Sequence, residues 1–66
     1  MNIILNGKPY VIENSNNLLN ILKTLDINPQ NLIAEVNGEI VTAKEFENKI
    51  INENDVIELV KFVGGG

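Results

Sequence analysis

Hydrophobic and polar residues alternate in short runs along the chain, at residues 2–6, 9–13, 32–41 and 56–63. Alternation with a period of two is typical of strands that bury one face. Asn6-Gly7 separates the first two runs, and Asn37-Gly38 interrupts the third. Because Asn and Gly readily take positive φ, the Asn-Gly pair favours a two-residue hairpin turn. The pattern therefore predicts two hairpins and a separate final strand.

The same alternation predicts which strand residues face the core. Tyr10 and Ile12 lie across from Ile3 and Leu5, and four later positions also point inward: Ala34, Val36, Ile57 and Leu59. Pro9 cannot donate a ladder hydrogen bond, so the strand that contains it is expected at an edge of the sheet.

A different period marks one helix. Apolar residues recur at i, i+3, i+4 and i+7, which places them on one helical face: Leu18, Ile21, Leu22 and Leu25. Asn17 precedes them and is a good N-cap, because its side chain can accept from backbone N–H groups of the first turn. Asn28-Pro29 is expected to stop the helix. Residues 43–51 are too polar for a full helix and predict a single turn that buries Phe46 and Ile50.

The order is strand, strand, helix, strand, strand, short helix, strand, which predicts an α+β fold of the ubiquitin-like β-grasp type. We expect a mixed sheet of four to five strands with one main helix on one face. The first and last strands should be parallel neighbours in the middle, because a long crossover separates them. Residues 1–63 form the domain, and residues 64–66 form a flexible glycine tail.

Composition narrows the chemistry. The 66 residues contain no Cys, no His and no Arg, which removes disulfides, thiolate metal sites and the commonest general base. The net charge of -4 disfavours nucleic acid and anionic membranes as partners. The first five residues are too short an apolar run for a signal peptide. We expect a cytoplasmic protein, monomeric by itself, that binds no metal.

Four stretches of the chain carry a resemblance to a known family. They are the opening strand with Asn6-Gly7, the helical stripe from Leu18, the segment 36–41, and Asn54-Asp55 with Ile57 and Leu59 before the glycines. Over its whole length the chain resembles the ThiS family of sulfur carriers in thiamine biosynthesis. It departs from the family pattern at Asn54, where Gly is usual, and Asn tolerates positive φ better than most residues.

The resemblance implies a function for the C-terminus. A ThiF-like adenylating enzyme, using ATP and magnesium, would activate the carboxylate of Gly66. Sulfur from a donor such as a cysteine desulfurase would convert it to a thiocarboxylate for a ThiG-like thiazole synthase. The carrier would bind no cofactor and contribute no catalytic residue.

The tail residues Gly64, Gly65 and Gly66 suit that role. Glycine has no Cβ, so the tail can enter a narrow channel, and three extended residues reach roughly 10 Å. The alternative reading is a disordered end or a cloning remnant.

A carrier also needs a docking face. If Ile57 and Leu59 are buried, Glu58, Val60 and Phe62 point outward, and Ile4 shares that face. Acidic residues are expected to form a solvated rim that steers towards a basic partner: Glu13, Asp26, Glu35, Glu45, Glu47, Glu53, Asp55 and Glu58. The alternative for the apolar residues Ile4, Val60 and Phe62 is that they are ordinary hydrophobic residues scattered over the surface.

Three other functions fit the same pattern. A MoaD-like small subunit of molybdopterin synthase shares the fold and the Gly-Gly end. A ubiquitin-like modifier would form isopeptide bonds, and a β-grasp adaptor would have an inert tail. The sulfur-carrier hypothesis is preferred over these three functions.

Overall fold

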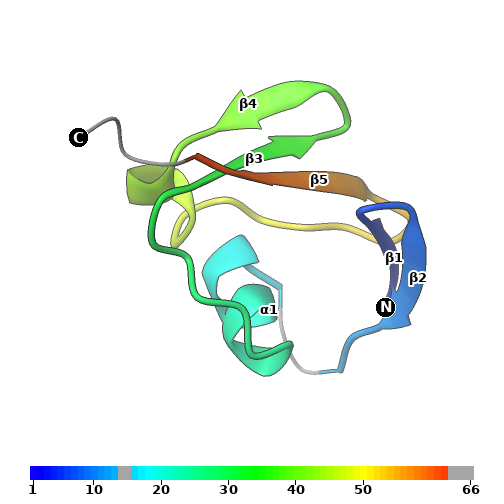
Figure 1. Cartoon of the computed structure of the whole chain (residues 1–66). Coiled ribbons are helices and arrows are strands. Elements are labelled where there is room, and N and C mark those ends of the chain that lie inside the picture. The colour runs from blue at the N-terminus through cyan, green and yellow to red at the C-terminus, as the bar shows by residue number, and fades with distance from the viewer. Residues whose placement is uncertain (14–15, 63–66) are drawn as a thin grey trace.

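Five strands form one mixed sheet in the order β2-β1-β5-β3-β4 in the computed structural model, which describes residues 1–13 and 16–62 (Figure 1). The strands are β1 (Asn2–Leu5), β2 (Lys8–Val11), β3 (Leu32–Val36), β4 (Glu39–Val41) and β5 (Val56–Lys61). The helices are α1 (Leu18–Thr24) and a 3-10 turn, η1 (Ala43–Glu45). The predicted β-grasp arrangement is confirmed.

The last strand, β5, is the centre of the sheet. It runs parallel to β1, with Leu5 opposite Ile57, and antiparallel to β3, with Ile33 opposite Val60. A central strand has neighbours on both sides, so β5 is held more firmly than an edge strand. Pro9 lies on β2, which is an edge of the sheet as predicted.

Both Asn-Gly turns adopt the left-handed backbone that the hairpins require. Asn6 and Gly7 have φ of 50° and 80°, and Asn37 and Gly38 have φ of 51° and 86°. Positive φ at both central residues is the signature of the type I′ turn, whose twist matches that of the flanking strands.

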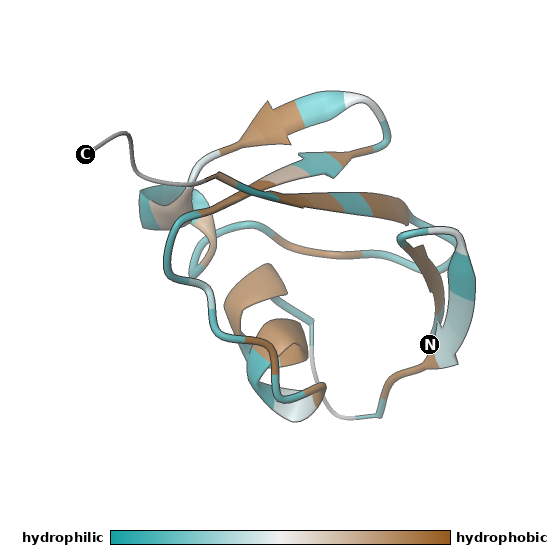
Figure 2. Ribbon diagram, in the orientation of Figure 1, coloured by the Kyte–Doolittle hydropathy of each residue, from teal (hydrophilic) through white to brown (hydrophobic). Residues whose placement is uncertain are grey.

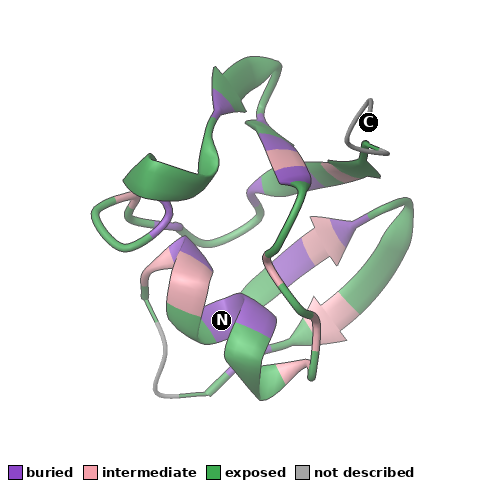
Figure 3. Cartoon of the chain, turned by 60° about the vertical axis from the view of Figure 1, so that its left-hand side comes forward, coloured by how far each residue is buried: buried purple, intermediate pink, exposed green. Residues whose placement is uncertain are grey.

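The core lies between α1 and one face of the sheet (Figures 2 and 3). The helix contributes Leu18, Ile21 and Leu22, and all three are fully buried. Asn17 caps the helix as predicted, because its Oδ1 accepts from the N–H of Asn20 at 2.8 Å. The strand residues expected to point inward are buried, except Tyr10 and Leu59, which are half-buried against the same core.

The helix ends earlier than Asn28-Pro29. Asp26 takes a φ of 61°, and the N–H groups of Asp26 and Ile27 donate to the carbonyls of Lys23 and Leu22 at 3.0 and 2.8 Å. This pair of bonds is a Schellman motif, which closes the helix at Leu25. No helix among the described residues is long and apolar enough to cross a membrane.

The segment after β4 differs from its prediction in one residue. Phe46 is buried, as expected, but Ile50 is 51% exposed and Ile51 is buried instead. Helical spacing does not apply there, because η1 covers a single turn, residues 46–48 form another turn, and Ile50 then makes a β-bridge to Asn17. The N–H of Ile51 donates to the carbonyl of Asn16 at 2.7 Å, which turns the Ile51 side chain towards the core.

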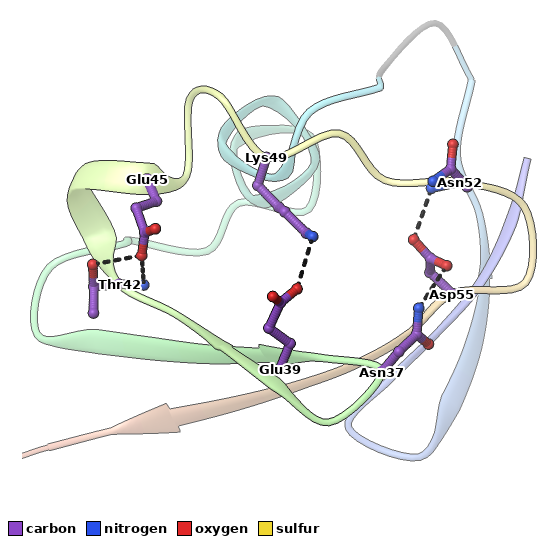
Figure 4. A network of polar contacts seen from close by, with 7 residues as sticks. All are labelled: Asn37, Glu39, Thr42, Glu45, Lys49, Asn52 and Asp55. Carbon is purple, nitrogen blue, oxygen red and sulfur yellow. Dashed lines mark hydrogen bonds and ion pairs between the residues drawn. The ribbon is translucent and has the colours of Figure 1, made fainter.

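Asp55 is buried, so it does not belong to the predicted acidic rim. One of its carboxylate oxygens accepts from the Asn37 side-chain amide at 2.9 Å, and the other accepts from the N–H of Asn52 at 2.8 Å (Figure 4). Asn37 Oδ1 in turn accepts from the N–H of Val56 at 2.9 Å. These bonds fix the start of β5 to the turn between β3 and β4. The preceding Asn54 has φ of 68°, the positive value that the sequence predicted it could take.

Two exposed carboxylates make the stability of the domain sensitive to acid. The Thr42 N–H and hydroxyl lower the pKa of Glu45 below its ordinary value of 4.5. The Asn2 side-chain amide and N–H lower the pKa of Glu53 in the same way. A pKa that is lower in the folded state stabilises the protein above the unfolded pKa, and the benefit is lost as the pH falls through the folded pKa.

We therefore expect the free energy of unfolding to decrease as the pH falls below 4.5. The double variant Glu45→Gln and Glu53→Gln should lose less stability over that interval than the wild type, because its side chains do not titrate. Urea unfolding at neutral and acidic pH measures both slopes. Equal slopes in the two proteins would show that these hydrogen bonds do not control the acid response.

Candidate functional site

The residues predicted to dock partners lie on the face of the sheet opposite α1. Along β5 the inward residues alternate with Glu58 and Val60, which point outward. Val60 is 60% and Phe62 45% exposed. Ile4, on the neighbouring strand, is half-buried. The predicted orientation is confirmed, whereas the docking role remains a prediction.

The strand register divides these residues into two groups. Ile4 lies opposite Val56, at the start of β5. Val60 lies opposite Ile33 of β3, near the end of β5. Val56 and Val60 are four positions apart along the strand, which is roughly 13 Å. Ile4 therefore does not contact the residues next to the tail. We call Ile33, Val60 and Phe62 the tail-side patch.

Sequence reasoning missed Ile33 as a member of this patch. The signal was present, because Ala34 and Val36 were assigned to the core and alternation then turns residues 33 and 35 outward. Glu35 was placed only in the general acidic rim. In the structure it lies directly opposite Glu58, and like charges in that position repel. The carboxylates of Glu35 and Glu58 thus place negative charge on the outward face, beside the tail-side patch.

The predicted reactive tail, Gly64, Gly65 and Gly66, lies outside the described residues, as does Val63. Phe62, the last described residue, is hydrogen-bonded to the chain just before β3. The N–H of Phe62 donates to the carbonyl of Asn31 at 2.9 Å, which extends the ladder between β3 and β5 by one residue. On the other side, the N–H of Leu59 donates to Asn6 Oδ1 at 2.7 Å. The chain that leads to the tail is therefore anchored on the central strand.

A hollow of about 340 Å³ lies beside the edge strand β4 and is lined by residues of β4 and of segment 44–49. Lys49 Nζ lies 3.3 Å from Glu39 Oε1, and Glu45 accepts from Thr42 (Figure 4). These contacts give Glu39, Glu45 and Lys49 partners within the domain. In residues 1–13 and 16–62, no cluster of three or more His, Cys, Asp or Glu side chains could hold a metal ion.

Comparison with known families decides where this arrangement belongs. The model of the ThiS family matches residues 3–66, almost the full length of the chain. The chain belongs to the ThiS family. Family and fold together support a sulfur-carrier role related to thiamine, in partnership with enzymes of that pathway.

The chain is also similar to one solved ThiS structure and to two other proteins. The crystal structure of the thiamine biosynthesis protein ThiS from Geobacter metallireducens superposes with a TM-score of 0.82 at 29% identity, covering all of both chains. The uncharacterized protein ycf40 of Trieres chinensis is 40% identical over 62 residues, which are 94% of this ThiS chain and 85% of that protein. A thiazole synthase of Magnetococcus marinus is 35% identical over all 66 residues, which make up 20% of its own length.

Proposed function

We propose that the protein is a sulfur carrier whose Gly66 carboxylate becomes a thiocarboxylate and supplies sulfur for the thiazole of thiamine. The observation that carries this proposal is the family match, which extends to residue 66. The structure supports it, because the strand that leads to the glycines is the central strand of the sheet. The folded domain would fix the point from which the glycine tail starts, relative to the docking face.

The chemistry begins with a poor electrophile. A carboxylate resists attack because its negative charge is delocalised, so it must first be activated. An oxygen of Gly66 attacks the α-phosphate of ATP, pyrophosphate leaves, and an acyl-adenylate forms. Sulfide then attacks the carbonyl carbon and displaces AMP, which leaves the thiocarboxylate. The absence of a side chain at Gly66 keeps the attacked carbonyl accessible.

The carrier needs partners for each step. An adenylating enzyme supplies the site for ATP and magnesium. A sulfur donor such as a cysteine desulfurase supplies sulfur as a persulfide, and a thiol reductant releases it as sulfide and is oxidised to a disulfide. A thiazole synthase then accepts the sulfur from the carrier. The similarity to the Magnetococcus marinus protein supports a thiazole synthase as a partner. Its name is thiazole synthase, and a fifth of its length is similar to this whole chain. A carrier-like segment within a synthase chain is what a functional partnership predicts.

Intact mass spectrometry tests the proposal. The protein is incubated with ATP, sulfide and the adenylating enzyme of the same organism. We expect the mass to increase by the difference between one sulfur and one oxygen atom. Covalent attachment to other proteins would instead indicate a modifier. An unchanged mass, with an enzyme that activates a known carrier, would contradict the proposal.

The tail-side patch gives a prediction for docking. Val60→Asp places a charge in the middle of the patch and beside Glu58. We expect the dissociation constant for the thiazole synthase of the same organism to increase roughly fivefold or more, since loss of a central interface residue costs above about 1 kcal/mol. Isothermal titration calorimetry measures the constant.

Val11→Asp is the matched control for this substitution. Val11 is 73% exposed and lies on the edge strand β2, away from the tail-side patch. The same change in charge and size there should leave the affinity near that of the wild type. Equal weakening by both substitutions would mean that overall charge, rather than the patch, determines binding.

A further inference from the structure

The central strand β5 has an open edge near its end. Its backbone groups alternate in direction, so residues of one parity bond to β3 and those of the other parity face β1. The N–H of Phe62 donates to Asn31 of the β3 side. On the opposite side, the carbonyl of Ile57 accepts from the N–H of Asn6 at 2.9 Å. By this alternation, the N–H and carbonyl of Lys61 face the β1 side.

β1 does not extend far enough to meet Lys61. Its pairing with β5 ends at Leu5 and Ile57, and the chain then turns back at Asn6 and Gly7. The Asn6 side chain provides one more partner for β5 on this side, because its Oδ1 accepts from the N–H of Leu59. Figure 1 shows that β1 meets β5 only near the start of β5. Within the described part of the chain, no backbone partner on this side reaches the carbonyl of Leu59 or either backbone group of Lys61.

We propose that this open edge of β5 receives an extended backbone segment of the thiazole synthase, which adds a short strand beside Lys61. The inference rests on the proposed function, because it assigns a second contact to the same partner. An enzyme that takes in residues 64–66 must approach the chain just before them, and Lys61 is the last residue of β5. Addition of a strand to a free sheet edge gives affinity through main-chain hydrogen bonds.

A partner segment fits this edge better than a second copy of the chain does. Antiparallel pairing of two β5 edges about Lys61 would place two Lys61 side chains opposite each other, and like charges in that position repel. Within residues 56–62, the open edge offers the Leu59 carbonyl and the two backbone groups of Lys61. Such a short ladder suits one contact within a larger interface.

Amide exchange tests the inference directly. In the free protein, the Lys61 amide should exchange faster than those of Leu59 and Phe62, which donate to Asn6 and Asn31. In the complex with the thiazole synthase of the same organism, we expect Lys61 exchange to slow by roughly three- to tenfold, an effect comparable to one new hydrogen bond. Unchanged exchange of the Lys61 amide in the complex would overturn the inference.

A pair of substitutions separates a hydrogen bond from simple shielding. Lys61→Pro removes the N–H, whereas Lys61→Val keeps it, and both remove the charge. Proline is tolerated where the N–H does not belong to the ladder, so both variants should have similar unfolding midpoints. We expect Lys61→Pro to bind the synthase roughly three- to tenfold more weakly than Lys61→Val. Equal affinities would overturn the inference.

Chemical synthesis offers the same test if Lys61→Pro lowers stability. Replacing the Lys61 amide by an ester removes the N–H and keeps the side chain, and the same weakening is expected. The outcomes also separate the two proposals. A wild-type protein that gains sulfur while Lys61→Pro, Lys61→Val and the ester bind equally contradicts only the strand addition. A wild-type protein that gains no sulfur contradicts the proposed function and, with it, the strand addition.

Discussion

Deletion of Gly66 is expected to slow formation of the thiocarboxylate by at least about a hundredfold, because a displacement of 1 Å in a reacting group can already cost that much. The shortened chain still ends in two glycines, Gly64 and Gly65. Each extended residue adds roughly 3.5 Å of reach, so the new carboxylate would stop well short of the ATP α-phosphate. The rate of mass gain with ATP, sulfide and the adenylating enzyme measures the effect.

Gly64→Ala is the control for this deletion. It keeps the length of the tail and the unsubstituted carbonyl of Gly66, and it adds only one methyl group further up the chain. We expect a modest decrease in rate. The deletion should leave the urea midpoint unchanged, since Gly66 lies beyond the strand that completes the sheet. A deletion variant that gains sulfur at the wild-type rate would show that the reach of the tail is unimportant.

Ile57→Ala is expected to have the largest effect on stability. Ile57 is fully buried and lies on the central strand, opposite Leu5 on one side and Val36 on the other. Removing a buried Ile side chain to Ala costs about 2–5 kcal/mol, because the transfer energy is lost and a cavity remains. A domain of 66 residues has a total stability of roughly 3–10 kcal/mol. The variant should therefore lose a large fraction of its free energy of unfolding and unfold at a much lower urea concentration than the wild type.

Val56→Ala is the matched control on the adjacent position. Val56 is 42% exposed on the outward face, so its truncation should change stability by only about 0.5 kcal/mol. Urea unfolding followed by circular dichroism compares the two variants. If Ile57→Ala retained the wild-type midpoint, the burial of β5 would not be the source of the stability of this domain.

Local patterns predicted most of the fold because they specify local geometry. Asn6-Gly7 and Asn37-Gly38 encode their turns through backbone conformation alone, and the helical stripe encodes one buried face. The errors arose where a longer-range contact or a cap decided the outcome. Asp26 closes the helix in a left-handed conformation that Gly or Asn adopts more often. Ile51 replaces Ile50 in the core because the segment pairs with Asn16, which no local period reveals.

The candidate site was predictable only in part. Alternation fixed the outward direction of Glu58 and Val60, but it could not fix which residues lie beside them. That information is in the register, which joins Val60 to Ile33 and separates it from Ile4. Asp55 illustrates the same limit. As a charged residue it was predicted to be exposed, but its hydrogen bonds with Asn37 and Asn52 allow it to be buried.

Transfer of labelled sulfur is the most direct measurement of the central claim. The thiocarboxylate form is prepared with a heavy sulfur isotope and supplied to the thiazole synthase of the same organism with its other substrates. The predicted result is heavy sulfur in the thiazole and a protein that returns to its carboxylate mass. Unlabelled thiazole, formed while the labelled protein keeps its sulfur, would contradict the claim that this chain carries sulfur for thiamine.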